Sequence, residues 1–79
     1  MNTFEKIKEI LVTQFGIADY KIIPSSNLRM DLDLDSLDEV EAVMAIEEEF
    51  GLDIPTEDSD TFKTVGDVVD YVEENTERE

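Results

Sequence analysis

The segment SLDEVEAVMAIEEEF, from Ser36 to Phe50, constrains the fold more than any other part of this sequence. Its apolar residues recur at helical spacing, and Gly51, followed by Ile54-Pro55, ends it where a helix C-terminus is expected. At its start, Ser36 and Glu39 form an S-x-x-E pattern, which predicts a capping box in which the serine hydroxyl satisfies one free amide, a contribution of about 1 kcal/mol. A helix over 36–50 is therefore predicted.

Helical patterns also dominate the rest of the chain, and strand patterns are almost absent. A first helix is indicated by apolar residues at spacings of three and four before a glycine: Phe4, Ile7, Leu11, Phe15 and Gly16. Asn2 and Glu5 resemble a capping box at its start. A short acidic segment after Pro55 has room for one helical turn, and the last helix is predicted over Thr64–Val72. In that helix Thr64 and Asp67 suit a cap, and four valines form an apolar stripe: Val65, Val68, Val69 and Val72.

The connection between the first two long helices, residues 17–35, is unusually long for a compact domain, and such loops are usually functional. It contains five apolar residues, which predict a loop packed on the core: Tyr20, Ile22, Ile23, Leu28 and Leu32. The expected fold class is all-α, a small four-helix bundle of three longer helices and one short helix. We expect a single domain over residues 1–79, with a frayed tail from about residue 74.

Composition excludes several classes of function. Twenty-two acidic residues against six basic ones give a formal charge of −16, which disfavours nucleic acid and anionic membranes as partners and favours proteins with basic patches. The chain has no cysteine and no histidine, so it cannot build a disulfide, a thiolate zinc site or a nucleophile–histidine pair. We therefore expect no catalysis, and any reactive group for acyl chemistry must be attached. The N-terminus lacks the features of a signal peptide, so a location in the cytoplasm or in an organelle matrix is expected, with the cytoplasm as the first choice.

The stretch DLDLDSLDEVE, Asp31 to Glu41, allows three interpretations: a calcium loop, a capped helix start, or a serine presented for modification. An EF-hand loop needs a glycine at its sixth position and a glutamate at its twelfth, where this chain has Ser36 and Ala42. The calcium interpretation therefore fails where the geometry is least forgiving, and no metal site is predicted. The cap explains the serine locally but not the rest of the helix.

Projected at about 100° per residue, the helix over 36–50 carries two apolar stripes. One consists of Ala42, Val43, Ile46 and Phe50, and the other of Leu37, Val40 and Met44. The two stripes cannot face the same core. The second is rimmed by acidic residues, namely Asp35, Asp38, Glu41, Glu47 and Glu48. From periodicity, packing on a neighbouring helix and docking on a partner are equally good explanations of this second stripe.

Two long matches identify a resemblance. The segments DSLDEVEAVMAIEEEFGLDIP and TVGDVVDYV, at their spacing in this chain, resemble the bacterial acyl carrier proteins of type II fatty-acid synthesis, without gaps over nearly the whole sequence. The resemblance implies that Ser36 of the D-S-L motif is the attachment site of 4'-phosphopantetheine, added from coenzyme A by a phosphopantetheinyl transferase. Acyl groups would then be carried as thioesters on the thiol that the chain itself lacks. A helix N-terminus also favours the new phosphate.

The same resemblance implies two further sites. A docking surface for enzymes with basic patches, among them the transferase, acyltransferases and fatty-acid-synthesis enzymes, would comprise Asp35, Leu37, Asp38, Val40, Glu41, Met44, Glu47, Glu48 and Ile54. An acyl pocket between helices would be lined by Leu28, Ile46, Phe62 and Val68, with Phe62 where an aliphatic residue is common in the family. The protein is expected to be a monomer.

One position departs from the family pattern. The family usually has DLGxDSL before the helix, whereas this chain has Asp33 in place of the glycine. Aspartate tolerates a positive φ better than most residues, so we expect the loop to keep its shape while gaining a charge. Two alternatives stay open: a specialised carrier for polyketide or other acyl-transfer pathways, and an unmodified acidic binding protein in which Ser36 is a cap.

Overall fold

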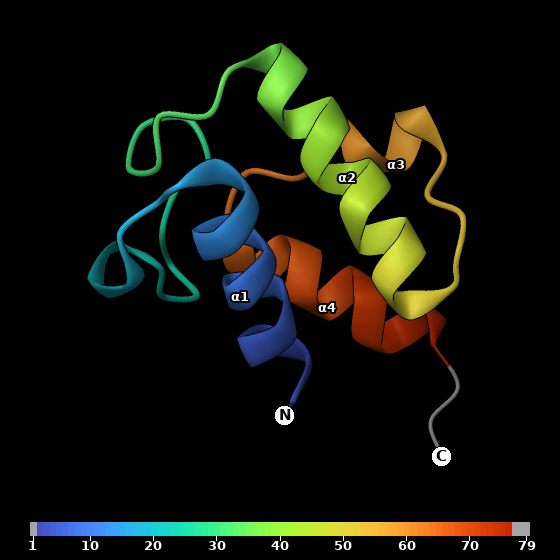
Figure 1. Ribbon diagram of the computed structural model, residues 1–79. Helices are drawn as coiled ribbons and strands as arrows, with labels where there is room; N and C mark the ends of the chain where they lie inside the picture. Colours follow the sequence, from blue (N-terminus) through green and yellow to red (C-terminus); the bar gives the residue numbers. More distant parts are fainter. Residues whose placement is uncertain (1, 77–79) are drawn as a thin grey trace.

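The computed structural model describes residues 2–76 and contains four α-helices and one short 3-10 helix. In chain order these are α1 (Thr3–Phe15), the 3-10 helix η1 (Asp19–Lys21), α2 (Ser36–Phe50), α3 (Thr56–Ser59) and α4 (Val65–Asn75). Helix α1 packs against both α2 and α4, and the long loop and α3 lie on opposite sides of the molecule in Figure 1. The predicted all-α bundle of three longer helices and one short helix is confirmed.

The termini of the long helices follow the predicted signals. The side chain of Asn2 accepts a hydrogen bond from the Glu5 backbone N–H at 2.8 Å and caps α1. Gly16 and Gly51 end α1 and α2 in the left-handed region, with φ of 68° and 67°. Because residues with a Cβ adopt this conformation at a cost, glycine is favoured at both positions.

The predicted cap of α2 is wrong. Asp35 is the N-cap, its carboxylate accepts from the Asp38 N–H at 2.8 Å, and the Asp38 carboxylate accepts from the Asp35 N–H at 3.3 Å. Ser36 is instead the first residue of the helix. The D-x-x-D pattern of Asp35–Asp38 and the S-x-x-E pattern of Ser36–Glu39 overlap, one position apart. The structure uses the first, with Asp35 in the extended conformation of an N-cap (φ −95°, ψ −175°). The serine hydroxyl is consequently not used in capping.

The loop over 17–35 packs on the core, but not through all the predicted residues. Ile22, Leu28 and Leu32 are buried, as predicted, and Ile17 and Leu34 join them. Tyr20 and Ile23 are 81% and 53% exposed, so their predicted burial is wrong. Tyr20 lies in the middle of η1, and this turn directs the next buried side chain, Ile22, inward instead.

Backbone contacts tie this loop to the start of α4. The Leu28 N–H donates to the Lys63 carbonyl at 2.9 Å, and the Val65 N–H donates to the Ser26 carbonyl at 3.0 Å. Ser26 is buried, and its hydroxyl donates to the Lys21 carbonyl and accepts from the Ile23 N–H. The loop is therefore held on both sides, and this fixes the path of the residues that lead to Ser36.

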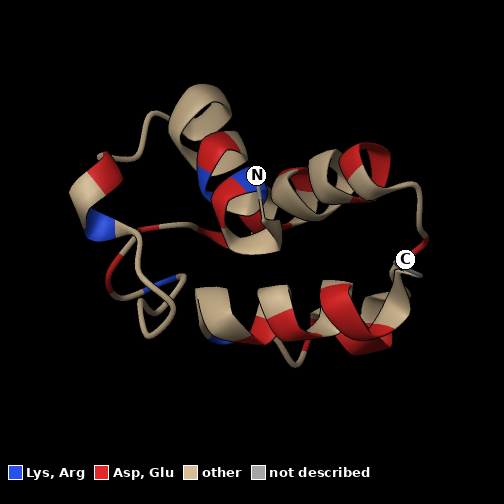
Figure 2. Cartoon of the chain, turned by 90° about the horizontal axis from the view of Figure 1, so that it is seen from below, with Lys and Arg blue, Asp and Glu red and all other residues tan. Residues whose placement is uncertain are grey.

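Helix α4 begins with the predicted capping box of Thr64 and Asp67 and buries Val65, Val68 and Val72. It continues to Asn75, three residues beyond the predicted end at Val72. Of the predicted frayed tail, residues 77–79 lie outside the described residues. No helix within residues 2–76 is long and apolar enough to cross a membrane. Acidic residues are spread over the helices, and the few basic ones lie mainly on α1 and in the loop regions (Figure 2).

Candidate functional site

Ser36 lies exposed at the first position of α2, directly after the cap. Helix geometry leaves the N–H groups of the first turn without partners inside the helix. The Asp35 carboxylate accepts a hydrogen bond from the N–H of Asp38. Among the contacts of residues 2–76, no acceptor is found for the N–H groups of Ser36 and Leu37. The serine hydroxyl therefore stands beside two free backbone donors at the positive end of a long helix.

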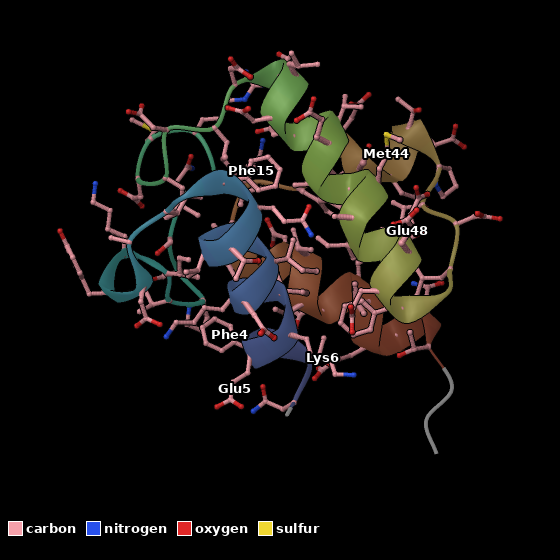
Figure 3. The ribbon with its side chains drawn as sticks, viewed as in Figure 1. Phe4, Glu5, Lys6, Phe15, Met44 and Glu48 are labelled. Carbon is pink, nitrogen blue, oxygen red and sulfur yellow. The ribbon has the colours of Figure 1, made fainter. Side chains whose placement is uncertain are left out.

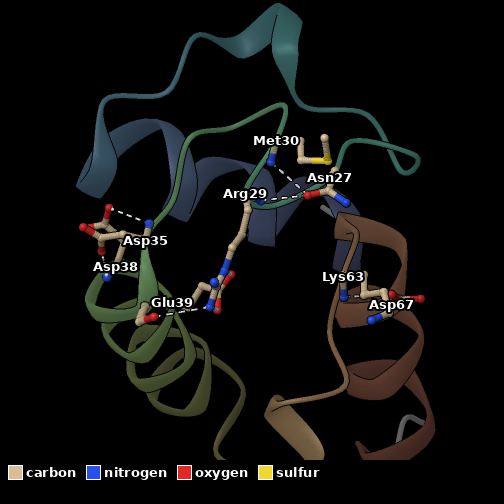
Figure 4. A network of polar contacts seen from close by, with 9 residues as sticks. Asn27, Arg29, Met30, Asp35, Asp38, Glu39, Lys63 and Asp67 are labelled. Carbon is tan, nitrogen blue, oxygen red and sulfur yellow. Dashed lines mark hydrogen bonds and ion pairs between the residues drawn. The ribbon is translucent and has the colours of Figure 1, made fainter.

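Arg29 reaches from the loop to this helix start (Figure 4). Its Nε donates to Glu39 Oε2 at 2.9 Å, and its Nη2 donates to Glu39 Oε1 at 3.1 Å and to Ser36 Oγ at 3.3 Å. The hydrogen bond with Glu39 and the charge of its carboxylate raise the pKa of Arg29 above its usual value. A guanidinium cation is thus fixed next to the serine hydroxyl.

The alternating segment DLDLD brings Ser36 to this position. Leu32 and Leu34 are both 5% exposed and anchor the segment in the core, while the three aspartates that alternate with them are exposed. Asp33 adopts φ = 62° in the left-handed region. The expectation that aspartate accepts a positive φ at this position is confirmed, whereas retention of the family's loop shape stays a prediction.

The second apolar stripe of α2 is exposed. Leu37, Val40 and Met44 are 66%, 56% and 58% exposed, so the stripe does not pack on a neighbouring helix within the described residues. Glu41 and Glu48 beside it are exposed as well. Figure 3 shows Met44 and Glu48 projecting from the side of α2 nearest α3. Packing of the stripe on a neighbouring helix is therefore excluded for the described residues, and docking on a partner stays a prediction.

Two members of the predicted docking surface are placed differently. Ile54 is only 6% exposed and belongs to the core, because the linker after Gly51 folds back under α2. Glu47 is half-buried, and its carboxylate accepts a hydrogen bond from the Ile54 N–H at 2.6 Å. Ile54 is therefore buried beside the predicted docking surface, and Glu47 holds the linker in place.

A cavity of about 320 Å³ lies behind α2. All four residues predicted for the acyl pocket line it: Leu28, Ile46, Phe62 and Val68. Its walls come from α2, α3, α4 and the long loop, and the buried side chains of Ile7 and Leu11 of α1 also line it. Exposed residues at its mouth include Ser36, Val40 and Met44, so the serine and the exposed stripe border the same opening.

The ion pair of Arg29 and Glu39 was not predicted from the sequence. Both residues also line the cavity. A signal was present, because Arg29 is the only basic residue between Lys21 and Lys63, in the most acidic part of the chain. Its partner could not be deduced, because the contact depends on the path of the loop.

Comparison with known proteins agrees with this geometry. The family model described as the phosphopantetheine attachment site matches residues 5–72, which defines a domain that carries this group. Acyl carrier proteins of Clostridium perfringens strains SM101 and 13 are each 48% identical over 75 residues, covering 95% of this chain and 99% of theirs. The chain belongs to the acyl carrier protein family. Members of this family are carriers without catalytic activity of their own, and their cofactor is 4'-phosphopantetheine.

The residues around Ser36 suit this cofactor. The group is linked through a phosphodiester, which needs an accessible hydroxyl and gains from positive charge and N–H donors. Ser36 offers the hydroxyl, Arg29 the positive charge, and the free N–H groups of Ser36 and Leu37 the donors.

Proposed function

We propose that Ser36 carries 4'-phosphopantetheine and that the protein delivers acyl groups to the enzymes of fatty-acid synthesis. The observation that carries the proposal is the position of Ser36: an exposed hydroxyl at the first residue of α2, beside a fixed cation and at the mouth of an apolar cavity. When bound, the group supplies a thiol on a long arm, on which acyl chains travel as thioesters.

In the attachment reaction, a phosphopantetheinyl transferase provides the catalytic groups. The Ser36 Oγ forms a bond to the phosphorus of coenzyme A that bears pantetheine, the bond to the nucleotide half breaks, and the hydroxyl proton passes to a base of the transferase. Arg29 donates to Oγ rather than accepting from it, so the hydroxyl proton is left free for that base. The helix N-terminus stabilises the negative charge of the resulting diester.

Between deliveries, the cavity shelters the acyl chain. Leu28, Ile46 and Val68 are buried and give it apolar walls, while Phe62 is half-buried at the side of α3. A cavity of about 320 Å³ is large enough for several methylene groups of a chain. Burial of each methylene is worth about 0.8 kcal/mol, which favours the sheltered position over water.

Delivery uses the exposed stripe of α2 as the docking surface. Leu37, Val40 and Met44 give it an apolar centre, and Glu41 and Glu48 give it an acidic rim, with Asp35 and Asp38 at its end. This combination suits enzymes that present basic residues around an apolar patch. We expect the chain to act as a monomer in the cytoplasm.

The test is intact-protein mass spectrometry before and after incubation with coenzyme A, magnesium and a broad-specificity phosphopantetheinyl transferase. We expect a mass gain of one phosphopantetheinyl group. The Ser36→Ala variant is the control, and Ser25→Ala, at an exposed serine elsewhere in the loop, is the matched control that should load normally.

Loading of Ser36→Ala would show that another residue is modified. If the folded wild-type protein gains no mass with several transferases, Ser36 is not an attachment site, and the chain acts as an acidic binding protein. Loading by a transferase of a specialised pathway, but not by one that serves fatty-acid synthesis, would assign the carrier to that pathway.

A further inference from the structure

Arg29 has hydrogen-bonding capacity that its present contacts do not use. A guanidinium group has five N–H donors. Three are engaged, by the two oxygens of Glu39 and by Ser36 Oγ. No acceptor for Nη1 is found among the contacts of residues 2–76. Arg29 can therefore keep Glu39 and still donate to a second anion next to Ser36.

The backbone of Arg29 is fixed independently of its side chain. Its N–H donates to Asn27 Oδ1 at 3.0 Å, which also accepts from the Met30 N–H, and its carbonyl accepts from the Asp33 N–H at 3.1 Å. Glu39, in the first turn of α2, holds the guanidinium end of the Arg29 side chain. The cation is thus held at both ends, so little conformational freedom is lost when it gains another contact.

The surroundings of Ser36 make this cation important once the phosphodiester is present. The diester adds a negative charge next to Asp35, with Asp33 and Asp38 close by in the sequence, in a chain of formal charge −16. Like charges at such short range repel, and the helix N-terminus alone supplies only partial positive charge. Arg29 is the basic side chain whose nitrogen lies 3.3 Å from the oxygen that would carry the phosphorus.

We propose that Arg29 is the side chain that holds the phosphodiester of the attached group, with Glu39 as the residue that positions it. The proposal rests on attachment at Ser36. In the modified protein, Nη1 and Nη2 of Arg29 donate to the free oxygens of the diester while Nε stays on Glu39. The start of the arm is thereby fixed at the mouth of the cavity, which Arg29, Ser36 and Glu39 all line.

The experiment compares unmodified and modified protein by nuclear magnetic resonance after mass spectrometry has shown complete loading. In the wild type, we expect the guanidinium nitrogen and proton signals of Arg29 to shift on loading. The phosphorus signal of the diester should differ between wild type and Arg29→Gln. Lys21→Gln, which removes the same charge from an exposed position at the end of η1, should leave the phosphorus signal unchanged.

Two further variants separate holding the phosphate from stabilising the fold. Arg29→Lys keeps the charge without the forked donors and should retain part of the phosphorus shift. Glu39→Gln keeps Arg29 but weakens its anchor, and we expect a phosphorus signal between those of wild type and Arg29→Gln. A purely structural ion pair would change the unfolding midpoint in these variants without moving the phosphorus signal.

The proposal is overturned if the phosphorus signal of Arg29→Gln equals that of the wild type, or if loading leaves the Arg29 guanidinium signals in place. The second measurement uses the wild-type protein and so does not depend on how a variant folds. A wild type that gains no mass contradicts the attachment at Ser36 and removes the basis of the inference. The mass readout thus distinguishes the two failures.

Discussion

Asp33 stands where the resemblance to the family predicts a glycine, and its backbone conformation is strained for a residue with a Cβ. Its φ of 62° lies in the left-handed region, where a Cβ crowds the following carbonyl. Aspartate is one of the few residues that tolerate this conformation, but glycine tolerates it better. Leu32 and Leu34 on either side are buried, so the backbone cannot relax without pulling one of them out of the core.

We expect Asp33→Gly to raise the free energy of unfolding by about 0.5–1 kcal/mol. The relief of backbone strain in the folded protein should outweigh the stabilisation of the unfolded chain by the greater conformational entropy of glycine. Asp33→Val should lower it by about 1–3 kcal/mol, since a β-branched residue is poorly tolerated at positive φ. Urea unfolding measures both. Asp33→Asn, which removes the charge and keeps the tolerance, is the control, and a glycine variant less stable than this one would contradict the strain argument.

Phe62 gives a second prediction at the scale of one residue. Its ring, which lines the cavity, packs edge to face on Tyr71 at 5.4 Å between centroids. The Tyr71 hydroxyl donates to Asp58 at 2.8 Å, and this hydrogen bond joins α4 to α3. An aliphatic residue at position 62 removes the ring from the cavity wall and leaves more room for a chain.

In Phe62→Ile protein loaded with a long acyl chain, we expect slower hydrolysis of the thioester, because more of the chain can be buried. Loss of the aromatic contact should cost about 0.5–1.5 kcal/mol of stability. Phe50→Ile is the matched control, since Phe50 is also half-buried but does not line the cavity. Equal hydrolysis rates in wild type and Phe62→Ile would show that this residue does not shape the space for the chain.

At the scale of elements, the start of α4 depends on two side chains. Thr64 Oγ1 accepts from the Asp67 N–H at 3.1 Å, and the Asp67 carboxylate accepts from the N–H groups of Lys63 and Thr64 at 2.9 and 3.1 Å. These backbone hydrogen bonds, with that from Lys63 first, lower the pKa of Asp67 below its usual value. Thr64→Ala should lower the free energy of unfolding by about 1 kcal/mol.

The lowered pKa of Asp67 makes this cap sensitive to acid. Because the folded pKa lies below the unfolded one, the stabilisation is full above the unfolded pKa of about 4 and is lost as the pH falls through the folded pKa. The stability advantage of wild type over Asp67→Asn should therefore be constant above about pH 5 and shrink as the pH falls below about 4. Comparing the two proteins cancels the effect of the other carboxylates, and a difference independent of pH would contradict the assignment.

Helix α2 carries the prediction for docking. Glu41→Lys combined with Glu48→Lys should weaken binding to a phosphopantetheinyl transferase about tenfold or more at low salt, mainly through slower association, while the helix content stays the same. Glu57→Lys combined with Glu73→Lys changes the charge equally at exposed positions outside the docking surface. Unchanged binding in the α2 double variant, or an equal loss in the control, would contradict docking on α2.

The elements also show what the sequence could predict. The bounds of α2 and the one turn of α3 follow from local patterns, because apolar spacing, glycine and proline act over a few residues. The cap of α2 was misassigned, since D-x-x-D and S-x-x-E both fit and the choice depends on how the preceding loop enters the helix. The predicted burial of Tyr20 and Ile23 is wrong because apolar residues scattered along an irregular loop do not define which side of the loop faces the core.

At the scale of the whole molecule, the site combines parts that are distant in the sequence. The four acyl-pocket residues were predicted through the resemblance, and the structure brings them into one cavity. The contact of Arg29 with Glu39 could not be predicted, because it requires the loop path that the backbone bonds of Ser26 and Leu28 to the start of α4 define. Long-range backbone pairing is what local sequence patterns do not contain.

Charge is the property that acts over the whole molecule. The described part measures 31 × 27 × 20 Å, whereas the Debye length is about 30 Å at 0.01 M salt and about 3 Å at 1 M. At low salt every acidic residue thus repels every other across the fold. At high salt only neighbouring charges interact. The destabilising repulsion between acidic residues therefore falls by more than the stabilisation that the few surface ion pairs provide.

Raising sodium chloride from 0.01 M to 1 M should therefore raise the melting temperature, by about 4–8 °C for each kcal/mol of repulsion removed. The variant with Glu57, Glu73 and Glu74 changed to glutamine should melt higher than wild type at 0.01 M and gain less from added salt, because less repulsion remains to be screened. Both are measured by circular dichroism. Since chloride salts also act on apolar surface, the comparison of slopes isolates the charge effect, and equal slopes in the two proteins would contradict it.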